Sequence, residues 1–156
     1  MEKPQIDQQV ITKLRAICAS ETDFVTIMAV VAGELFHAVD GFDWVGFYRV
    51  VAPGVLKLGP YQGGHGCLVI LFDKGVCGAA ARKKQTQIID DVHQFDGHIA
   101  CAASTQSELV IPVFDKNQNL VAVLDIDLDQ PAFFSRQLAT QLETLLAKLF
   151  GPDEAA

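Results

Sequence analysis

The sequence predicts an α+β fold in which helices flank a central antiparallel sheet. Helical periodicity lies mainly toward the two ends of the chain, whereas the middle holds strand-like runs joined by turn residues. Most strand runs come as consecutive hairpins, which favours antiparallel pairing. With 156 residues, half of them hydrophobic, the chain is expected to form one domain over residues 1–156. We expect an N-terminal helix in residues 1–22 and the core in 23–151.

The first two expected elements are amphipathic helices. Apolar side chains recur at helical spacing in residues 6–17, and a second stripe runs over residues 24–39. The polar segment 20–23 supplies a cap-like break between them. Asp40 and Gly41 end the second helix and lead into a strand.

The middle of the chain predicts a hairpin followed by a strand and a short helix. Residues 42–51 and 55–61 form the two arms around a Pro-Gly turn. The flexible segment 62–66 is rich in glycine. A strand is then expected over residues 67–72, and a short helix ends near Lys84.

The last third of the chain predicts a long loop, a second hairpin and a closing helix. Residues 88–107 show almost no periodicity and are rich in Asp, His, Gly, Ala and Ser. Long loops of this kind tend to be functional. Strands are expected over residues 108–114 and 120–128, and leucines in 138–149 predict a helix capped by Ser135.

Charge and composition exclude several function classes. The chain carries 19 acidic and 12 basic residues, a net charge of -7, which argues against a nucleic-acid partner. No apolar run approaches the roughly 18–20 residues of a membrane span. The N-terminus lacks the features of a signal peptide, so a cytoplasmic protein is predicted. In that reducing compartment, the four cysteines are expected to be thiols, ligands or catalysts rather than structural disulfides.

Carboxylates gather on one face of the strand expected over residues 120–128. Alternation places Asp125 and Asp127 on the same side as Val123, opposite the apolar side chains. Glu108 begins the neighbouring strand and would lie across the same sheet. Either this is a strand end that faces solvent, or it is a pocket for a cation such as a ligand ammonium group.

Two aromatic side chains share a face of the first strand. Trp44, Gly46 and Tyr48 alternate onto one side, with a gap between the rings large enough to admit a ligand. The alternative is ordinary core packing, the commoner fate of aromatic residues on strands.

The long loop concentrates imidazole, thiol and carboxylate groups. His93, His98 and Cys101 could bind a metal, although their spacing matches no standard zinc pattern. A nucleophilic Cys–His pair and a redox thiol activated by His98 are the other hypotheses. The other cysteines are expected, from their local sequence, to be small buried hydrophobic residues: Cys18, Cys67 and Cys77.

Six segments together carry a family resemblance: residues 44–48, 58–63, 75–78, 91–101, 107–112 and 123–127. Over about residues 24–150, and in this order, the chain resembles the free methionine-(R)-sulfoxide reductases, a family of catalytic GAF domains. The His-Ile-Ala-Cys and Leu-Asp-Ile-Asp pieces are the specific ones. The resemblance implies a single GAF-like domain.

The resemblance implies a thiol redox cycle. Cys101 would be the nucleophile and Cys67 the resolving cysteine, while the part of Cys77 in recycling is left open. Attack on the sulfoxide would give methionine and a sulfenic acid, followed by an intramolecular disulfide. A thioredoxin-type dithiol protein would restore the thiols. No cofactor and no metal is implied.

The resemblance also implies the substrate contacts. Trp44 and Tyr48 would line the pocket for the methyl end of free methionine sulfoxide. Glu108 would be the acid that protonates the sulfoxide oxygen, with a pKa raised by its aspartate neighbours. The substrate's ammonium group would be held by a set of carboxylates: Glu108, Asp125 and Asp127, with Asp91 nearby.

The sequence departs from the family at two places. The family usually has Asp directly after the nucleophile, where this chain has Ala102, and the glycine-rich segment 63–66 is looser than the usual pattern. Two other functions compete with the reductase. One is a non-catalytic GAF domain that senses a small molecule, and the other is a metal-binding redox module. A homodimer is expected by fold analogy only.

Overall fold

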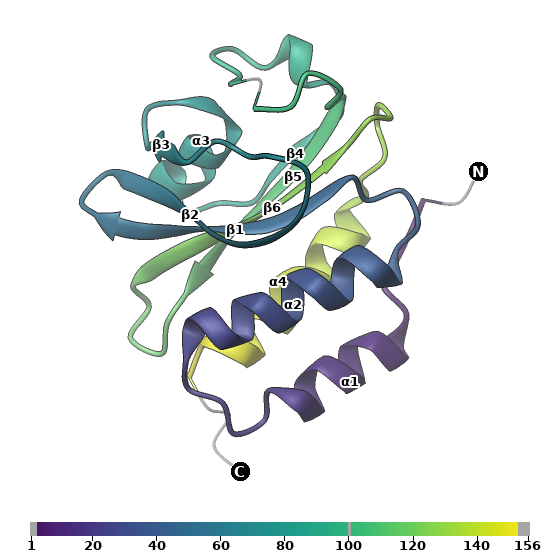
Figure 1. Cartoon of the computed structure of the whole chain (residues 1–156), viewed down its shortest axis with the longest axis vertical. Helices are drawn as coiled ribbons and strands as arrows, with labels where there is room; N and C mark the ends of the chain where they lie inside the picture. The colour runs from purple at the N-terminus through teal and green to yellow at the C-terminus, as the bar shows by residue number, and fades with distance from the viewer. Residues whose placement is uncertain (1–2, 100, 153–156) are drawn as a thin grey trace.

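The structure, a computed structural model that describes residues 3–99 and 101–152, is built on one six-stranded antiparallel sheet. The strand order is β3-β2-β1-β6-β5-β4. Helices α2 and α4 cover one face of the sheet, with α1 packed on their outer side, and α3 covers the other face (Figure 1). The predicted α+β fold with a central antiparallel sheet is confirmed.

Three helices form the thicker layer. They are α1 (Gln8–Ile17), α2 (Phe24–Ala38) and α4 (Arg136–Phe150). The side chain at each N-cap, an Asp, an Asp and a Ser respectively, accepts hydrogen bonds from amides of the first turn. These caps satisfy donors that have no partner within the helix. Among the described residues, no helix is long and apolar enough to cross a membrane.

The sheet is assembled from two hairpins joined through their first and last strands. The β1–β2 hairpin and the β5–β6 hairpin meet by antiparallel pairing of β1 with β6, and short strands close both edges. The bounds are β1 (Trp44–Ala52), β2 (Val55–Gly63), β3 (Val69–Leu71), β4 (Gln87–Ile89), β5 (Ser107–Phe114) and β6 (Leu120–Leu128).

Two expected elements differ from the observed ones. β3 keeps only the middle of the strand predicted over residues 67–72, whereas α3 (Gly75–Lys83) ends where the short helix was expected to end. The stretch predicted as a loop contains β4 and a 3₁₀ helix, η1 (Val92–Gln94). All three side chains of β4 are half-buried, so no alternation marks this strand. It forms because its backbone pairs with β5.

The two faces of the sheet bury different kinds of side chain. On β6, residues 122, 124, 126 and 128 pack into a large apolar core beneath α1, α2 and α4. Val123 points to the other face, into a smaller cluster with Cys77 of α3. The face under α3 therefore accommodates polar groups, whereas most of the buried apolar side chains lie on the side of α1, α2 and α4.

The packing of α3 against the sheet edge predicts a contrast between two glycines. A Cβ on Gly78 would lie 2.7 Å from the backbone oxygen of Leu71 and 2.8 Å from that of Phe72, whereas a Cβ on Gly33 meets nothing within 4 Å. Gly78→Ala should lower the free energy of unfolding by about 1–3 kcal/mol through overpacking. Gly33→Ala, inside α2, should raise it by about 0.5–1 kcal/mol. Urea denaturation of both variants measures this, and equal stabilities would contradict the packing described.

Candidate active site

A small enclosed cavity lies between the α3 face of the sheet and the loops that precede β3 and β5. Its volume is about 30 Å³, which is room for about one or two water molecules. Side chains from β1, β5, β6, α3 and both loops line it, including Trp44, Tyr48, Cys77, His98, Cys101, Glu108, Asp125 and Asp127.

Strand register brings the three carboxyl groups together. Glu108 of β5 lies opposite Asp127 of β6, and the next facing pair on the same side is Val110 with Asp125. Directly opposite residues in antiparallel strands point to the same face. The expected grouping of Glu108, Asp125 and Asp127 on one face is thus seen in the structure, and the group faces the cavity rather than solvent.

Glu108 is held in its protonated form. It is only 6% exposed, and burial is the largest cause that raises its pKa, to about 8. The nearby charge of Asp127 raises the pKa further, whereas hydrogen bonds from Asp125 and Cys77 lower it. The sequence argument expected both aspartates to raise this pKa by repulsion. That cause was wrong for Asp125, because contact distance makes it a hydrogen-bond partner.

The pKa values of the two aspartates are also raised well above their usual range. Burial is the largest cause that raises the pKa of Asp125, followed by the charge of Glu108. Burial and the charge of Asp125 raise the pKa of Asp127. Asp125 Oδ1 is buried and has no hydrogen-bond partner among the described residues. A buried oxygen without a partner is costly, so this end of the cavity is suited to a ligand that brings several N–H donors.

Cys77 contacts the same acid cluster. Its Sγ lies 3.9 Å from Glu108 Oε1, and burial raises the pKa of this thiol well above its usual value. Ligand atoms of Cys77, Glu108 and Asp125 lie within 4.8 Å of one another. In the part of the chain that the structure describes, this is the one group of three such residues close enough to hold a metal ion.

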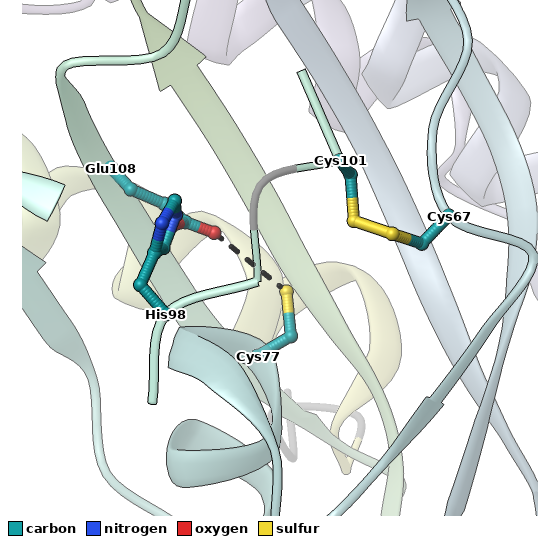
Figure 2. The surroundings of a disulfide bond; sticks show 5 residues. All are labelled: Cys67, Cys77, His98, Cys101 and Glu108. Atoms are coloured by element: carbon teal, nitrogen blue, oxygen red, sulfur yellow. Dashed lines mark hydrogen bonds and ion pairs between the residues drawn. A yellow bond between two sulfur atoms is a disulfide. The ribbon is translucent and has the colours of Figure 1, made fainter. Parts of the chain in front are cut away.

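A disulfide lies beside the cavity, which its Cys101 lines. Cys67, in the loop after β2, is bonded to Cys101, and their Cα atoms are 5.3 Å apart. Figure 2 shows this bond beside Cys77, Glu108 and His98. The pairing agrees with the one implied by the family resemblance. The idea that Cys67 is a small buried hydrophobic residue was wrong, while Cys77 and Cys18 are buried free thiols.

His98 belongs to the acid cluster rather than to the thiol. Its Nε2 is 3.7 Å from Glu108 Oε2, and burial lowers the pKa of the imidazole. The hypothesis of a metal site formed by His93, His98 and Cys101 is not supported, because His93 is exposed and the Cys101 sulfur is in a disulfide. From the sequence, His98 was considered as a metal ligand or as an activator of the thiol, but not as a neighbour of Glu108. Its place directly before the Ile-Ala-Cys segment was the available signal.

The aromatic wall differs from the expected one. Trp44 stacks on Tyr48 at 5.8 Å and on Tyr61 at 5.3 Å between ring centroids. The expected gap over Gly46 was wrong, because a Cβ there would lie 2.5 Å from the Trp44 ring and 2.5 Å from Tyr61. The indole itself fills the space and donates a hydrogen bond from Nε1 to the carbonyl of Gly64, at 3.0 Å. Tyr61 was missed, although hairpin pairing with Gly46 could have revealed it.

Asp91 is not brought into the cavity. Its carboxylate accepts a hydrogen bond from the backbone N–H of His93, at 2.9 Å, and caps η1. It is absent from the residues that line the cavity. Local capping therefore accounts for an aspartate that the resemblance placed near the substrate. Of the loop motif, Ala100 lies outside the described residues.

Comparison with known proteins agrees with this geometry. A GAF domain family profile matches residues 18–149. The free methionine-R-sulfoxide reductase of Escherichia coli is 40% identical over 154 residues, covering 94% of this chain and 92% of its own. The chain belongs to the free methionine-(R)-sulfoxide reductase family of GAF domains. The resemblance drawn from its motifs is thereby confirmed, and the chain is an enzyme of this reductase family.

Solved structures of the reductase family share the whole fold. A free methionine-R-sulfoxide reductase from Neisseria meningitidis, in complex with its substrate, is 35% identical and has a TM-score of 0.86, covering 96% of this chain and 92% of its own. The fRMsr of Staphylococcus aureus in its reduced form is 34% identical with a TM-score of 0.88, and 94% of each chain is covered. The disulfide and the acid cluster thus lie on a fold that the family shares throughout.

The raised pKa of Glu108 makes the stability of the disulfide form depend on pH. Above its usual pKa of 4.5 the unfolded chain loses this proton, while the folded chain keeps it up to about pH 8. The free energy of unfolding therefore falls as the pH rises from 4.5 to 8. Glu108→Gln has no proton to lose. Between pH 5 and pH 8, its free energy of unfolding should therefore rise relative to that of the wild type by more than about 1.4 kcal/mol.

Urea denaturation of the oxidised protein at several pH values measures this difference. Glu21→Gln, at an exposed position, controls for the loss of one negative charge. A difference between wild type and Glu108→Gln that stays constant with pH would show that Glu108 is ionised in the folded protein.

Proposed function

We propose that this chain reduces free L-methionine-(R)-sulfoxide to methionine through Cys101, Cys67 and the acid Glu108. The observation that supports it most is that a disulfide and a cluster of acids with raised pKa values lie around one cavity. A reductase of sulfoxides needs a thiol pair and a proton donor at the same place. The names of the relatives supply the substrate and its epimer.

The acid end of the cavity suits the substrate's ammonium group. Asp125 and Asp127 face the cavity, and Asp125 Oδ1 is buried with no partner among the described residues. An ammonium group offers three N–H donors and a positive charge, which would lower the pKa of both aspartates and let them ionise. Methionine sulfoxide inside a peptide has no such group, so its exclusion follows from the same contacts. We leave Asp91 out of this binding site.

The aromatic residues of β1, beside the aspartates of β6, suit the methyl end. Trp44 and Tyr48 present stacked rings to the cavity, and an aromatic surface favours an apolar sulfur substituent. Cys101 and Glu108 line the same cavity. A substrate held by its ammonium and methyl groups would have its sulfur within reach of the nucleophile and its oxygen near the acid.

The first chemical step transfers the oxygen to the enzyme. The Cys101 thiolate attacks the substrate sulfur while Glu108 gives its proton to the sulfoxide oxygen. A sulfur–sulfur bond forms first. The protonated oxygen then moves to the Cys101 sulfur as the sulfur–sulfur bond and the sulfur–oxygen bond of the substrate break, so methionine leaves and Cys101 becomes a sulfenic acid. Cys101 is thereby oxidised by two electrons, and the substrate is reduced by two.

The second step forms the disulfide. The Cys67 thiolate attacks the sulfenic sulfur, and the hydroxyl leaves as water after taking a proton. With the disulfide formed, the cavity of about 30 Å³ is too small for an amino acid. We infer that the oxidised enzyme must be reduced before it binds substrate again. A thioredoxin-type dithiol protein, available in the cytoplasm, supplies those electrons.

A GAF domain that only senses a ligand is the alternative. Such a domain needs neither a disulfide over its pocket nor an acid with a pKa near 8. Both features are found here, and they favour catalysis.

Purified enzyme with dithiothreitol should convert the R epimer of free methionine sulfoxide to methionine and leave the S epimer unchanged. Cys101→Ser should abolish this activity because it removes the attacking sulfur, whereas Cys18→Ala, at a buried free cysteine that does not line the cavity, should keep it. Chiral chromatography of the amino acids measures both. Full activity in Cys101→Ser, or none in the wild type, would overturn the proposal.

Glu108→Gln tests whether Glu108 acts by donating a proton or only by filling its place in the site. Gln fills the same space and keeps a hydrogen-bond donor, but it has no proton to give. We expect kcat to fall by about 10²–10⁴-fold, with a much smaller change in KM. The descending limb of kcat/KM near pH 8, which we attribute to Glu108, should disappear from the residual activity. An unchanged kcat would show that another group protonates the sulfoxide.

A further inference from the structure

A strip of exposed apolar side chains follows Cys67 directly. Leu68 is 69% exposed, Val69 51% and Leu71 46%. They account for half of the six large hydrophobic residues found exposed in the described part of the chain. We call these three residues the β3 strip. Contiguous exposed apolar surface on a soluble domain marks an interaction site more often than chance.

The β3 strip also offers free backbone groups. β3 is the first strand in the order of the sheet and pairs with β2 alone. Leu58 N–H donates to the carbonyl of Leu68 at 2.9 Å, and Phe72 N–H donates to that of Gly54 at 3.0 Å. Since alternate residues of a strand point their backbone groups to opposite sides, the N–H and C=O of Val69 face away from β2. An extended segment of another protein can pair there.

The two sulfurs of the disulfide have different surroundings. Cys101 lines the cavity, whereas Cys67 does not. Cys67 precedes the β3 strip without a break, and Val69 follows it by two residues, about 7 Å along an extended chain. A protein that pairs with the edge of β3 therefore has its nearest disulfide atom in Cys67.

Charge around the β3 strip differs from that of the chain as a whole. Residues 44–72 contain Arg49 and Lys57 and no Asp or Glu, although the full chain has 19 acidic residues. This edge of the sheet is apolar to weakly basic, so it repels an acidic partner less than the rest of the surface does.

We propose that the β3 strip is the docking site of the protein dithiol that reduces the enzyme, and that this reductant attacks Cys67. The inference rests on the proposed function, because it concerns the disulfide formed in that cycle. The partner is a thioredoxin-type protein with an apolar, neutral to acidic surface and an extended segment beside its reactive cysteine. Docking at β3 leaves the acid cluster untouched.

The exchange balances in two steps. A thiolate of the reductant attacks Cys67 Sγ, the Cys67–Cys101 bond breaks, and Cys101 leaves as a thiolate facing the cavity. The second thiol of the reductant then attacks its own sulfur in the mixed disulfide, which releases Cys67. The reductant loses two electrons and ends as a disulfide. This order frees the catalytic thiol first, at the place where the next substrate binds.

Substitutions on the β3 strip test the docking site. Leu68→Asp and Val69→Asp should each lower kcat/KM for reduced thioredoxin at least about fivefold, the effect of losing one energetically important interface contact. Turnover with dithiothreitol, which needs no docking surface, should be unchanged. Val25→Asp is the matched control, because Val25 is also 51% exposed but lies on α2, across the sheet (Figure 1). It should leave both rates unchanged.

The attacked sulfur is identified by trapping. A thioredoxin variant that keeps only its attacking cysteine should form a mixed disulfide with the oxidised enzyme. Mass spectrometry of the tryptic peptides should place the bond at Cys67. A bond at Cys101 would overturn the assignment of the attacked sulfur.

Each other outcome is also decisive. Equal loss with both reductants, or no loss with either, would overturn the docking site. If the two variants instead convert a dimer to a monomer in sedimentation and keep the thioredoxin rate, the β3 strip is an interface between two copies of this chain. Absence of dithiothreitol-supported activity in the wild type would refute the proposed function instead, so the two failures are distinguishable.

Discussion

The pairing of β5 with β6 is the constraint on which the site depends. It sets Glu108 opposite Asp127 and keeps Asp125 on the same face, so three carboxyl groups meet where water is largely excluded. Three ionised groups at such a place would repel one another and lose their hydration. Raised pKa values relieve that conflict in the disulfide form, and a ligand ammonium group would relieve it in the complex. Glu108 holds a proton with a pKa of about 8, and the reduction of a sulfoxide consumes a proton.

Apolar packing on the other face of the same strands stabilises this arrangement. Leu124 and Ile126 alternate with the aspartates and pack beneath α2 and α4, so each strand contributes to a large core and to the site at once. The disulfide adds a second constraint from the other side of the cavity. It joins the loop after β2 to the loop before β5, at the wall of the cavity that Cys101 lines.

Sequence patterns predicted the parts of this protein that depend on alternation and local caps. The period of two along β6 placed Asp125 and Asp127 on the polar face, and the caps before α2 and α4 marked where those helices begin. Tertiary contacts determined the rest. β4 has no pattern of its own and forms on β5, Trp44 turns its ring over Gly46, and Asp91 is used to cap η1. Burial is the largest cause of the raised pKa of Glu108, and the spacing of residues in the sequence does not reveal burial.

The central claim is that the cavity couples one disulfide to the reduction of one sulfoxide. The most direct test is a single turnover of fully reduced enzyme, freed of reductant and mixed with an excess of both sulfur epimers of free L-methionine sulfoxide. We predict one methionine per enzyme, loss of only the R epimer, and a fall from four titratable thiols to two after denaturation, since Cys18 and Cys77 remain free. Four thiols with no methionine formed would contradict the account.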